Sequence, residues 1–512
     1  MRGERFSTPE EIKDFLHPLG VGHGGLVAFE EDGIKYVEDS EYHQLVLGST
    51  GVGKTWFMIM SQVRSIIESG RNGIIIDAKG EIHRNTACYA ANQGYDIRVV
   101  DFRHFRGQRY NPLSYPKALY DAGEKGKAQE QVQEIVLNLV QSVGRNVDPF
   151  WINAERSLLS GCINLLIETA AIEDCTFSNI ISLINEDWNS LETEGREIVD
   201  NGSFSEIVNM LPYDSAAKAQ LLNYIGTKAT ITKSCIMSET LGTLAKFCIT
   251  RESVAMTSKD DLDIFNLDTP VGKPFMLYII LPDDSNVHND LAGILICQLI
   301  NRLVRLADSS KYSGKLPVQV NMILEELGNV GAAISGLPFL LTASRSRNIK
   351  MTLSLQALYQ LNSIFGDSKA ATILSCVDTL VCFRTSDWNT LCEISNKCGN
   401  KIVQSGDIRF MQPLLSEPQL MSLKTGQALI LLGGGRVKYV ETFKLYKDLF
   451  DCSDLEEIPV PKIEEHKIIK PVRFSDLKSR ITKKDRDEAL PKRQISPFKQ
   501  TFDKYFGGES DD

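Results

Sequence analysis

The residues with the clearest chemical signature lie in a glycine-rich stretch near the amino terminus. The spacing G-x-x-x-x-G-K-[ST] is formed by Gly48, Gly53, Lys54 and Thr55, and a helix-like segment follows over residues 55–68. A glycine-rich turn between a strand and a helix presents backbone N–H groups to an anion without obstruction by side chains. The pattern therefore predicts a phosphate-binding loop. This loop comprises Gly48, Ser49, Thr50, Gly51, Val52, Gly53, Lys54 and Thr55.

Two side chains of this loop predict that the bound molecule is a nucleoside triphosphate with magnesium. Lys54 would neutralise the β and γ phosphates. The hydroxyl of Thr55 would hold Mg²⁺, an ion that takes few protein ligands and shares its octahedron with phosphate oxygens and water. The alternative is a chance match in an unrelated loop, although strand, loop and helix patterns occur here in the order that the motif requires.

An acidic pair forms the second candidate group. Glu325 and Glu326 end an apolar run that begins at Val320. In a nucleotide-hydrolysing site the first acid of such a pair orients Mg²⁺, usually through water, and the second polarises the attacking water as a general base. We assign Glu325 and Glu326 to these roles in that order. Two exposed acids at the end of a strand are the alternative.

Polar residues on either side of the apolar run from Ile349 complete the candidate site. Gln356 ends this run, where an amide can contact both the γ-phosphate and the attacking water; a hydrogen-bonded residue at a strand terminus is the alternative. Arg345 and Arg347 precede the run, and an arginine here would reach the nucleotide of an adjacent subunit to stabilise transition-state charge. Solvated arginines are the alternative, and the first interpretation requires an oligomer.

Asp77 and Lys79 follow another buried strand pattern. Open α/β sheets place ligand-contacting residues at the carboxyl ends of their strands. We interpret Asp77 as a residue near Mg²⁺ that does not bind it directly. The role of Lys79 stays open, because turn and capping roles explain both residues almost as well.

Length and composition limit the class of protein. A chain of 512 residues has room for about two to four domains. Eleven cysteines without a signal-like amino terminus indicate reduced thiols in the cytoplasm. The cysteines at 376, 382, 392 and 398 are spaced more widely than usual zinc ligands, and we interpret them as buried thiols. No apolar run approaches the roughly 18 residues that a membrane-spanning helix needs, so we expect no membrane crossing by this chain itself.

The charge distribution argues against a generally basic DNA-binding surface. The net charge is −10, and affinity for phosphate backbones comes mainly from Lys and Arg. Between residues 117 and 270 there are roughly two acidic residues for each basic one, which accounts for about the whole excess. We therefore expect any DNA contact to be local, for instance through basic loops that line a pore.

The order of strand-like and helix-like patterns predicts one α/β sheet with a helical insertion. Short buried strands alternate with helices on both sides of a region dominated by helical periodicity. We predict the following parts: an amino-terminal lead-in (1–40), the first part of a nucleotide-binding domain (41–116), an inserted all-α domain (117–270), the second part of the nucleotide-binding domain (271–450) and a charged, flexible tail (451–512).

An ordered set of motifs carries a family resemblance over residues 24–447. The motifs are HQLVLGSTGVGKT, IIIDAKGE, RYNPL, DPFW, ILEELGNVG, SRSRNIKMTLSLQALYQL and LLSEPQLMSLKTGQALILLGGG. In this order they resemble the type IV secretion system coupling proteins of the TraG/TraD class, especially those of Gram-positive conjugative elements. Seven ordered elements are far more specific than a phosphate loop alone.

The resemblance implies a fold and a function. It implies a RecA-like P-loop motor domain interrupted by an all-α domain, and a homo-hexamer around a channel that binds ATP and Mg²⁺ between subunits. Such proteins feed single-stranded DNA with its attached relaxase to the secretion channel at the cytoplasmic face of the membrane. By position, Lys54 and Thr55 match the nucleotide-binding pair, Glu326 the catalytic acid, Gln356 the sensor and Arg345 the inter-subunit finger.

Two departures from the family pattern bear on function. The family usually has Asp-Glu where this chain has Glu325-Glu326, so the carboxylate that faces the metal stands one methylene further out. Family members also commonly carry transmembrane helices, for which this sequence shows no pattern. We expect either that a membrane anchor precedes the given sequence or that a separate membrane protein recruits this one.

Two other functions remain open from the sequence. One is a double-stranded DNA-pumping ATPase of the FtsK/HerA type, against which the helical insertion and the LLSEPQL stretch argue. The other is a receptor that binds relaxase or effector proteins through the acidic insertion and tail, and uses ATP only as a conformational ligand.

Overall fold

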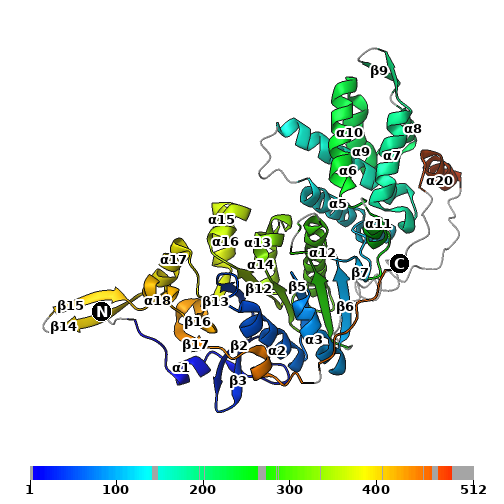
Figure 1. The fold of residues 1–512 in the computed structure, drawn as a ribbon. Helices are drawn as coiled ribbons and strands as arrows, with labels where there is room; N and C mark the ends of the chain where they lie inside the picture. The colour runs from blue at the N-terminus through cyan, green and yellow to red at the C-terminus, as the bar shows by residue number, and fades with distance from the viewer. Residues whose placement is uncertain are drawn as a thin grey trace. The chain divides into compact units, whose positions relative to one another are not determined.

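The structure is a computed structural model of the chain. It describes residues 4–140, 148–194, 197–200, 202–248, 250–262, 273–283, 285, 288–334, 336–405, 408–453, 455–463 and 471–486. The chain divides into two compact units. The first contains Met1–Arg103, Leu267–Asn286 and Leu299–Val460, and the second contains His104–Asn266, Val287–Gln298 and Pro461–Asp512. Figure 1 shows both units in ribbon form and labels many of their helices and strands.

The first unit is built around a large sheet with the strand order β17-β16-β13-β4-β12-β11-β5-β10-β6. Neighbouring strands from β13 to β6 are parallel, whereas β16 and β17 add an antiparallel edge. The strands are β4 (His43–Leu47), β5 (Asn72–Asp77), β6 (Asp96–Asp101), β10 (Phe275–Ile280), β11 (Val320–Leu324), β12 (Ile349–Leu355), β13 (Val377–Phe383), β16 (Gln427–Leu432) and β17 (Val437–Thr442).

The central strands are buried on both faces, as their continuous apolar runs predict. Every residue of β4, β5, β11 and β12 is buried. Complete burial of one such aliphatic side chain contributes about 1.5–3 kcal/mol, so the middle of the sheet is the rigid part of this unit. The strand patterns after the phosphate loop and after residue 275 are confirmed as strands of one sheet.

Helices make the crossovers that parallel strands require. They are α2 (Met60–Glu68), α3 (Glu81–Asn92), α13 (Leu327–Val330), α14 (Leu337–Arg345), α15 (Tyr359–Phe365), α16 (Asp367–Ser375), α17 (Trp388–Cys398), α18 (Glu417–Met421) and α19 (Tyr446–Leu449). The helix predicted over residues 55–68 differs in its first turn. Thr55–Ile59 is a π-helical turn, a geometry frequent at functional sites, and the α-helix begins only at Met60.

Two smaller sheets belong to the same unit. After α1 (Pro9–Lys13), the strands β1 (His17–Pro18), β2 (Leu26–Glu31) and β3 (Ile34–Glu38) form an antiparallel sheet in the order β1-β3-β2. The hairpin of β14 (Asn400–Ser405) and β15 (Ile408–Pro413) was not predicted. Most of β15 is exposed, so this strand lacks the buried apolar run on which strand prediction depends.

The second unit is mainly helical. Its helices are α4 (Ser114–Asp121), α5 (Lys125–Leu139), α6 (Pro149–Thr169), α7 (Phe177–Asn189), α8 (Gly202–Met210), α9 (Ala216–Gly226), α10 (Thr230–Ala245), α11 (Arg251–Thr257) and α20 (Phe474–Arg486). The boundary between the units falls within α12 (Asn289–Asp308). The short strands β7 (Arg106–Gly107), β8 (Glu192–Glu194) and β9 (Glu197–Asp200) also lie in this unit.

The predicted tail contains a helix that the sequence patterns missed. α20 lies within residues 451–512, and its Leu477 is completely buried, so this part of the tail is packed rather than flexible. The side chain of Phe474 packs edge-to-face on Phe204 of α8, and the two ring centroids are 5.0 Å apart. The helix α20 has few apolar residues, and the contact with the distant helix α8 helps to bury them. Residues 454, 464–470 and 487–512 of the predicted tail lie outside the described residues.

In the described part of the chain, no single helix is both long enough and apolar enough to cross a membrane. Only the helical segments Leu327–Ala333 and Leu337–Arg345 reach such a length and composition together, and a sharp bend separates them.

A neutral histidine connects the start of β4 to its neighbours. His43 is completely buried; its Nε2 lies 2.8 Å from the carbonyl oxygen of Leu341, and its Nδ1 accepts a hydrogen bond from the backbone N–H of Met351 at 3.0 Å. The acceptor role of Nδ1 places the ring proton on Nε2. Burial, together with the positive charges of Lys350 and Arg345, lowers the pKa of His43 to about 4.

This pKa predicts a contribution of His43 to acid sensitivity. Between pH 6.5 and about 4 the unfolded chain binds a proton at His43 that the folded chain does not bind, so acidification through this window favours unfolding. A His43→Gln variant lacks this proton. We expect the stability advantage of the unmodified chain over the variant to shrink from about pH 7 to about pH 5, by up to about 1.4 kcal/mol per pH unit. Urea unfolding measures it, and an advantage independent of pH would contradict a neutral buried imidazole.

Candidate nucleotide-binding site

The phosphate loop lies at the carboxyl edge of the sheet. It leaves β4 at Leu47, and the backbone N–H of Gly48 donates to the carbonyl oxygen of Leu355, the last residue of β12, at 3.2 Å. Glycine is needed at position 53 for two reasons. The φ of Gly53 is +86°, and a Cβ there would stand 2.5 Å from the ring of Phe57. The loop therefore has the glycine-dependent backbone that its motif predicts.

Lys54 is held inside this loop. Its side chain is buried, and its Nζ donates to the carbonyl oxygen of Gly48 at 2.5 Å. Burial lowers the pKa of Lys54, and the negative charges of Glu326 and Glu325 oppose that shift. The predicted cation thus faces the two predicted acids.

Thr55 and Glu325 meet across 270 residues of sequence. The hydroxyl of Thr55 donates to Oε1 of Glu325 at 2.5 Å. Burial raises the pKa of Glu325 to about 7, and the negative charge of Asp77 adds to the shift. The two residues predicted to serve Mg²⁺ therefore lie side by side, and the negative charge buried beside them favours a cation.

Asp77 supports this arrangement from the end of β5. Its carboxylate is completely buried and accepts hydrogen bonds from the backbone N–H groups of Lys79, at 3.3 Å, and His83, at 2.8 Å. It therefore fixes the turn into α3 and places a negative charge near Glu325. Burial raises the pKa of Asp77 to about 6 although the backbone N–H groups act in the opposite direction.

Glu326 and Gln356 form the other side of the site. Nε2 of Gln356 donates to Oε2 of Glu326 at 3.3 Å. Glu326 has a left-handed backbone, with φ +53° and ψ +50°, directly before α13. A glutamate in this region carries roughly 1–2 kcal/mol of backbone strain. Such strain at a residue that points into a site is typical of a functional constraint.

The sequence analysis did not predict a role for Gln360, which holds the backbone at Gln356. Oε1 of Gln360 accepts hydrogen bonds from the backbone N–H groups of Gln356, at 2.8 Å, and Ala357, at 3.4 Å. It fixes the chain where β12 ends. The only available signal was a second glutamine four residues after Gln356, and this spacing is too common to single out the residue.

Arg345 lies away from the other predicted residues. It is exposed at the end of α14, four residues before β12 begins, whereas the phosphate loop follows the carboxyl ends of the strands. Its guanidinium stacks on the ring of Tyr42, 4.1 Å from the centroid. Within one chain the structure therefore brings together Lys54, Thr55, Glu325, Glu326 and Gln356, and leaves Arg345 at the opposite edge of the sheet.

The residues at the carboxyl edge fit a magnesium nucleotide. The loop combines backbone N–H groups, the ammonium of Lys54 and open space on the side where Gly51 has no Cβ. A hydroxyl and a carboxylate in contact are the oxygen donors that Mg²⁺ prefers. This donor set agrees with the predicted cofactors, ATP and Mg²⁺.

The prediction of buried thiols holds for two of the four cysteines considered. Cys382 and Cys398 are buried free thiols, as predicted, whereas Cys376 and Cys392 are only partly buried. Of the described residues, the one group of His, Cys, Asp and Glu side chains close enough to hold a metal contains none of these cysteines.

The strain at Glu326 generates a stability prediction. Glu326→Gly removes the carboxylate and relieves the left-handed backbone, whereas Glu326→Ala removes the carboxylate and keeps the strain. We expect the glycine variant to be more stable than the alanine variant by about 1 kcal/mol in urea unfolding. An alanine variant as stable as the glycine variant would show that the backbone here relaxes without cost.

Several solved structures are similar to this chain. Among solved structures, the bacterial conjugative coupling protein TrwBdeltaN70 in an unbound form is similar with a TM-score of 0.63 and 15% sequence identity, covering 87% of this chain and 93% of that chain. TrwB in complex with the non-hydrolysable ATP analogue ADPNP gives 0.62 and 16%, covering 87% and 94%. TrwB in complex with ADP and Mg²⁺ gives 0.61 and 16%, covering 91% and 95%. No curated protein matches the chain.

These likenesses confirm the predicted fold class, an α/β RecA-like P-loop fold with an all-α domain. The family model for conjugative DNA transfer by the type IV secretory system matches residues 7–416. That match covers most of the chain and confirms the resemblance seen in the motifs. The chain belongs to the type IV secretory system conjugative DNA transfer family.

Proposed function

We propose that this chain is an ATP-hydrolysing coupling protein that recruits a relaxase–DNA complex and drives single-stranded DNA into a conjugation channel. Membership of the conjugative DNA transfer family supports the general role. The observation that carries the ATPase part is the contact of Thr55 with Glu325 beside Lys54, Glu326 and Gln356, because these are the parts of a phosphoryl-transfer site.

We assign the roles of the site as follows. Lys54 and the loop N–H groups would bind the phosphates, and Thr55 with Glu325 would hold Mg²⁺. Glu326 takes the proton of the attacking water, and Gln356 orients that water through its amide. ATP, when bound, supplies the phosphoanhydride bond whose hydrolysis drives movement.

The longer acid at position 325 is compatible with these roles. An aspartate is usual here in the family, and the extra methylene shifts the carboxylate. In this chain the Glu325 carboxylate still reaches the hydroxyl of Thr55 at 2.5 Å. This contact supports magnesium binding despite the substitution.

The position of Arg345 supports an oligomer. It is exposed at the edge of the sheet opposite the phosphate loop of its own chain, so an arginine finger can act only on a neighbouring subunit. Subunits arranged head to tail bring this edge to the next loop, and a closed ring of such contacts is a homo-hexamer in the proposal. We place this ring at the cytoplasmic face of the membrane, anchored by a partner or by a preceding segment, next to the channel components.

A second candidate function, a substrate receptor that uses ATP only as a conformational ligand, is favoured by a feature of the helical unit. A cavity of about 780 Å³ lies among α5, α6 and α9 and is lined by polar and acidic residues, including Glu130, Glu134 and Asp214. Tyr213 beside it is almost fully exposed. An acidic cavity with an exposed aromatic residue suits a basic peptide of a transferred protein. Recruitment through this cavity is compatible with the motor function.

ATP turnover with DNA tests the proposed function. We expect turnover that single-stranded DNA stimulates more than duplex DNA. Lys54→Ala should lose nucleotide binding, and Glu326→Gln should keep binding and lose at least about a hundredfold in turnover, the usual contribution of a general base. Stimulation by duplex DNA alone would favour the FtsK/HerA-type pump. Binding without turnover under every condition would favour the receptor.

Two arginine variants test the proposed role of Arg345 as an inter-subunit arginine finger. Arg345→Ala should abolish turnover and leave ATP binding nearly unchanged. The matched control is Arg347→Ala, because Arg347 forms an ion pair with Asp308, 2.8 Å away, within its own chain.

The two inactive variants should complement each other. In a random equal mixture of Lys54→Ala and Arg345→Ala chains, about a quarter of the interfaces combine an intact loop with an intact finger, so about a quarter of the turnover should return. No recovery, although the two variants form mixed oligomers, would contradict action between subunits.

A further inference from the structure

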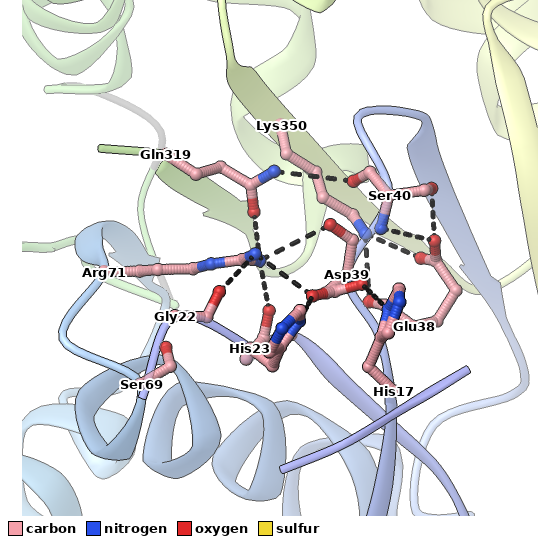
Figure 2. A network of polar contacts seen from close by, with 12 residues as sticks. His17, Gly22, His23, Glu38, Asp39, Ser40, Ser69, Arg71, Gln319 and Lys350 are labelled. Atoms are coloured by element: carbon pink, nitrogen blue, oxygen red, sulfur yellow. Dashed lines mark hydrogen bonds and ion pairs between the residues drawn. The ribbon is translucent and has the colours of Figure 1, made fainter. Parts of the chain in front are cut away.

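A cluster of two imidazoles and a carboxylate lies in the amino-terminal sheet. Nδ1 of His17 is 2.8 Å from Oδ1 of Asp39, and Nδ1 of His23 is 2.8 Å from Oδ2 of the same carboxylate. The two rings stack, with centroids 4.6 Å apart. Figure 2 shows both imidazoles directed at Asp39. Among the described residues, these form the only group of three or more His, Cys, Asp and Glu side chains whose ligand atoms all lie within 4.8 Å of one another.

The backbone that carries the cluster is fixed by several elements. His17 lies on β1 and pairs with Val37 of β3, two residues before Asp39. His23 closes a tight turn, in which the N–H of Gly20 donates to the carbonyl oxygen of His23 at 3.1 Å and the reverse bond is 2.9 Å long. The turn is tied to the end of α2, because the N–H of Gly22 donates to the carbonyl oxygen of Ser69 at 2.9 Å.

Arg71 fixes the carboxylate and the turn together. Its guanidinium lies 3.1 Å from Oδ2 of Asp39 and donates to the carbonyl oxygen of Gly22 at 2.8 Å (Figure 2). It also donates to the carbonyl oxygen of Gly24 at 2.5 Å. Oε1 of Gln319 accepts a further hydrogen bond from Arg71 at 2.7 Å. A ligand carboxylate that is held by an outer partner is the usual second layer of a metal site.

The carboxylate of Asp39 is much more buried than the two imidazole rings. The side chain of Asp39 is only 8% exposed, whereas those of His17 and His23 are 58% and 49% exposed. The anion is therefore preorganised, and the imidazoles can rotate and can be reached by an ion from solvent. Neutral imidazole nitrogen and carboxylate oxygen are ligands for divalent first-row transition metals, whereas Mg²⁺ and Ca²⁺ prefer oxygen alone.

The distances agree with coordination after small rotations. With metal–ligand bonds of about 2.0–2.2 Å, two ligand atoms of one ion lie about 2.8–4.4 Å apart. The nitrogen–oxygen distances of 2.8 Å fall at the lower end of this range, and the whole cluster lies within 4.8 Å. An ion bound to Oδ1 would leave Oδ2 to Arg71. Solvent would complete the coordination sphere on the exposed side.

We propose that His17, His23 and Asp39 form a binding site for a divalent transition-metal ion such as Zn²⁺. The three ligands leave open positions for water, as in sites with two histidines and one carboxylate. Because Arg71 shares the carboxylate and adds a positive charge, we expect weaker binding than at a closed structural zinc site.

The site is separate from the nucleotide site and has a structural consequence. Arg71 directly precedes β5, and Gln319 directly precedes β11, so the cluster lies at the amino edge of the sheet, opposite the phosphate loop. A bound ion would join β1, the Gly20–His23 turn and the residue after β3. It would thereby fasten the amino-terminal sheet as one body against α2 and β5.

Calorimetric titration of the full chain with Zn²⁺ tests the site. We expect one equivalent to bind with micromolar affinity, and His17→Ala/His23→Ala to lose at least tenfold in affinity. The matched control is His104→Ala, which removes an exposed histidine outside the cluster and should bind as the unmodified chain does. Lys54→Ala should also bind Zn²⁺ normally, so failure of the ATPase proposal would leave this result unaffected.

Two further readouts keep the test decisive. Co²⁺ in the same site should give visible d–d absorption without the sulfur charge-transfer band that cysteine ligands produce. Zn²⁺ should raise the melting temperature of the unmodified chain, and His23→Gln, a single exposed substitution that leaves Asp39 and Arg71 in place, should lose most of that rise. Absence of Zn²⁺ binding, equal affinity in the double variant, or a thiolate band with Co²⁺ would overturn the proposal.

Discussion

The parallel register of four strands is the constraint on which the rest of this structure depends. β4, β12, β11 and β5 are adjacent and parallel, and their carboxyl ends lie within two residues of one another in register. Leu47 pairs with Leu355, and Leu324 pairs with Leu353 on one side and with Ile76 on the other. Whatever follows each strand therefore meets at one edge. A shift of one residue in β11 would turn its buried residues to the other face and move Glu325 away from Thr55. Complete burial of these strands makes such a shift costly.

Acidic side chains are concentrated at the carboxyl edge of the sheet, and the basic side chain nearby neutralises them only in part. Glu325 and Asp77 are buried close to each other, and burial raises the pKa of both carboxyl groups. Lys54 supplies a positive charge nearby but donates to the carbonyl oxygen of Gly48 rather than to an acid. A divalent cation would lower the free energy of these buried carboxylates, and Lys54 would then be available to the phosphates of a nucleotide. We infer that metal and nucleotide bind together here.

Sequence reasoning predicted what depends on local pattern. The strands of the large sheet, the phosphate loop and the acidic pair were all visible because buried parallel strands have continuous apolar runs and polar residues follow their ends. The roles of the site residues remain proposals, but Thr55, Glu325, Glu326 and Gln356 were predicted to lie near one another, and they do.

The features that sequence reasoning missed depend on tertiary contacts. The helix α20 has few apolar residues and is buried by distant segments. The strand β15 is largely exposed. The left-handed backbone at Glu326 is not marked by a glycine in the sequence. The same holds for His17, His23 and Asp39. No local spacing links them, because an antiparallel pairing and a turn held by Arg71 bring them together.

The proposed motor couples ATP hydrolysis to movement along single-stranded DNA. Displacement of streptavidin from the biotinylated end of a single-stranded oligonucleotide measures that coupling directly. We expect release with ATP, and none with a non-hydrolysable analogue or with Lys54→Ala. Steady ATP turnover without any release, from either end of the strand, would contradict it.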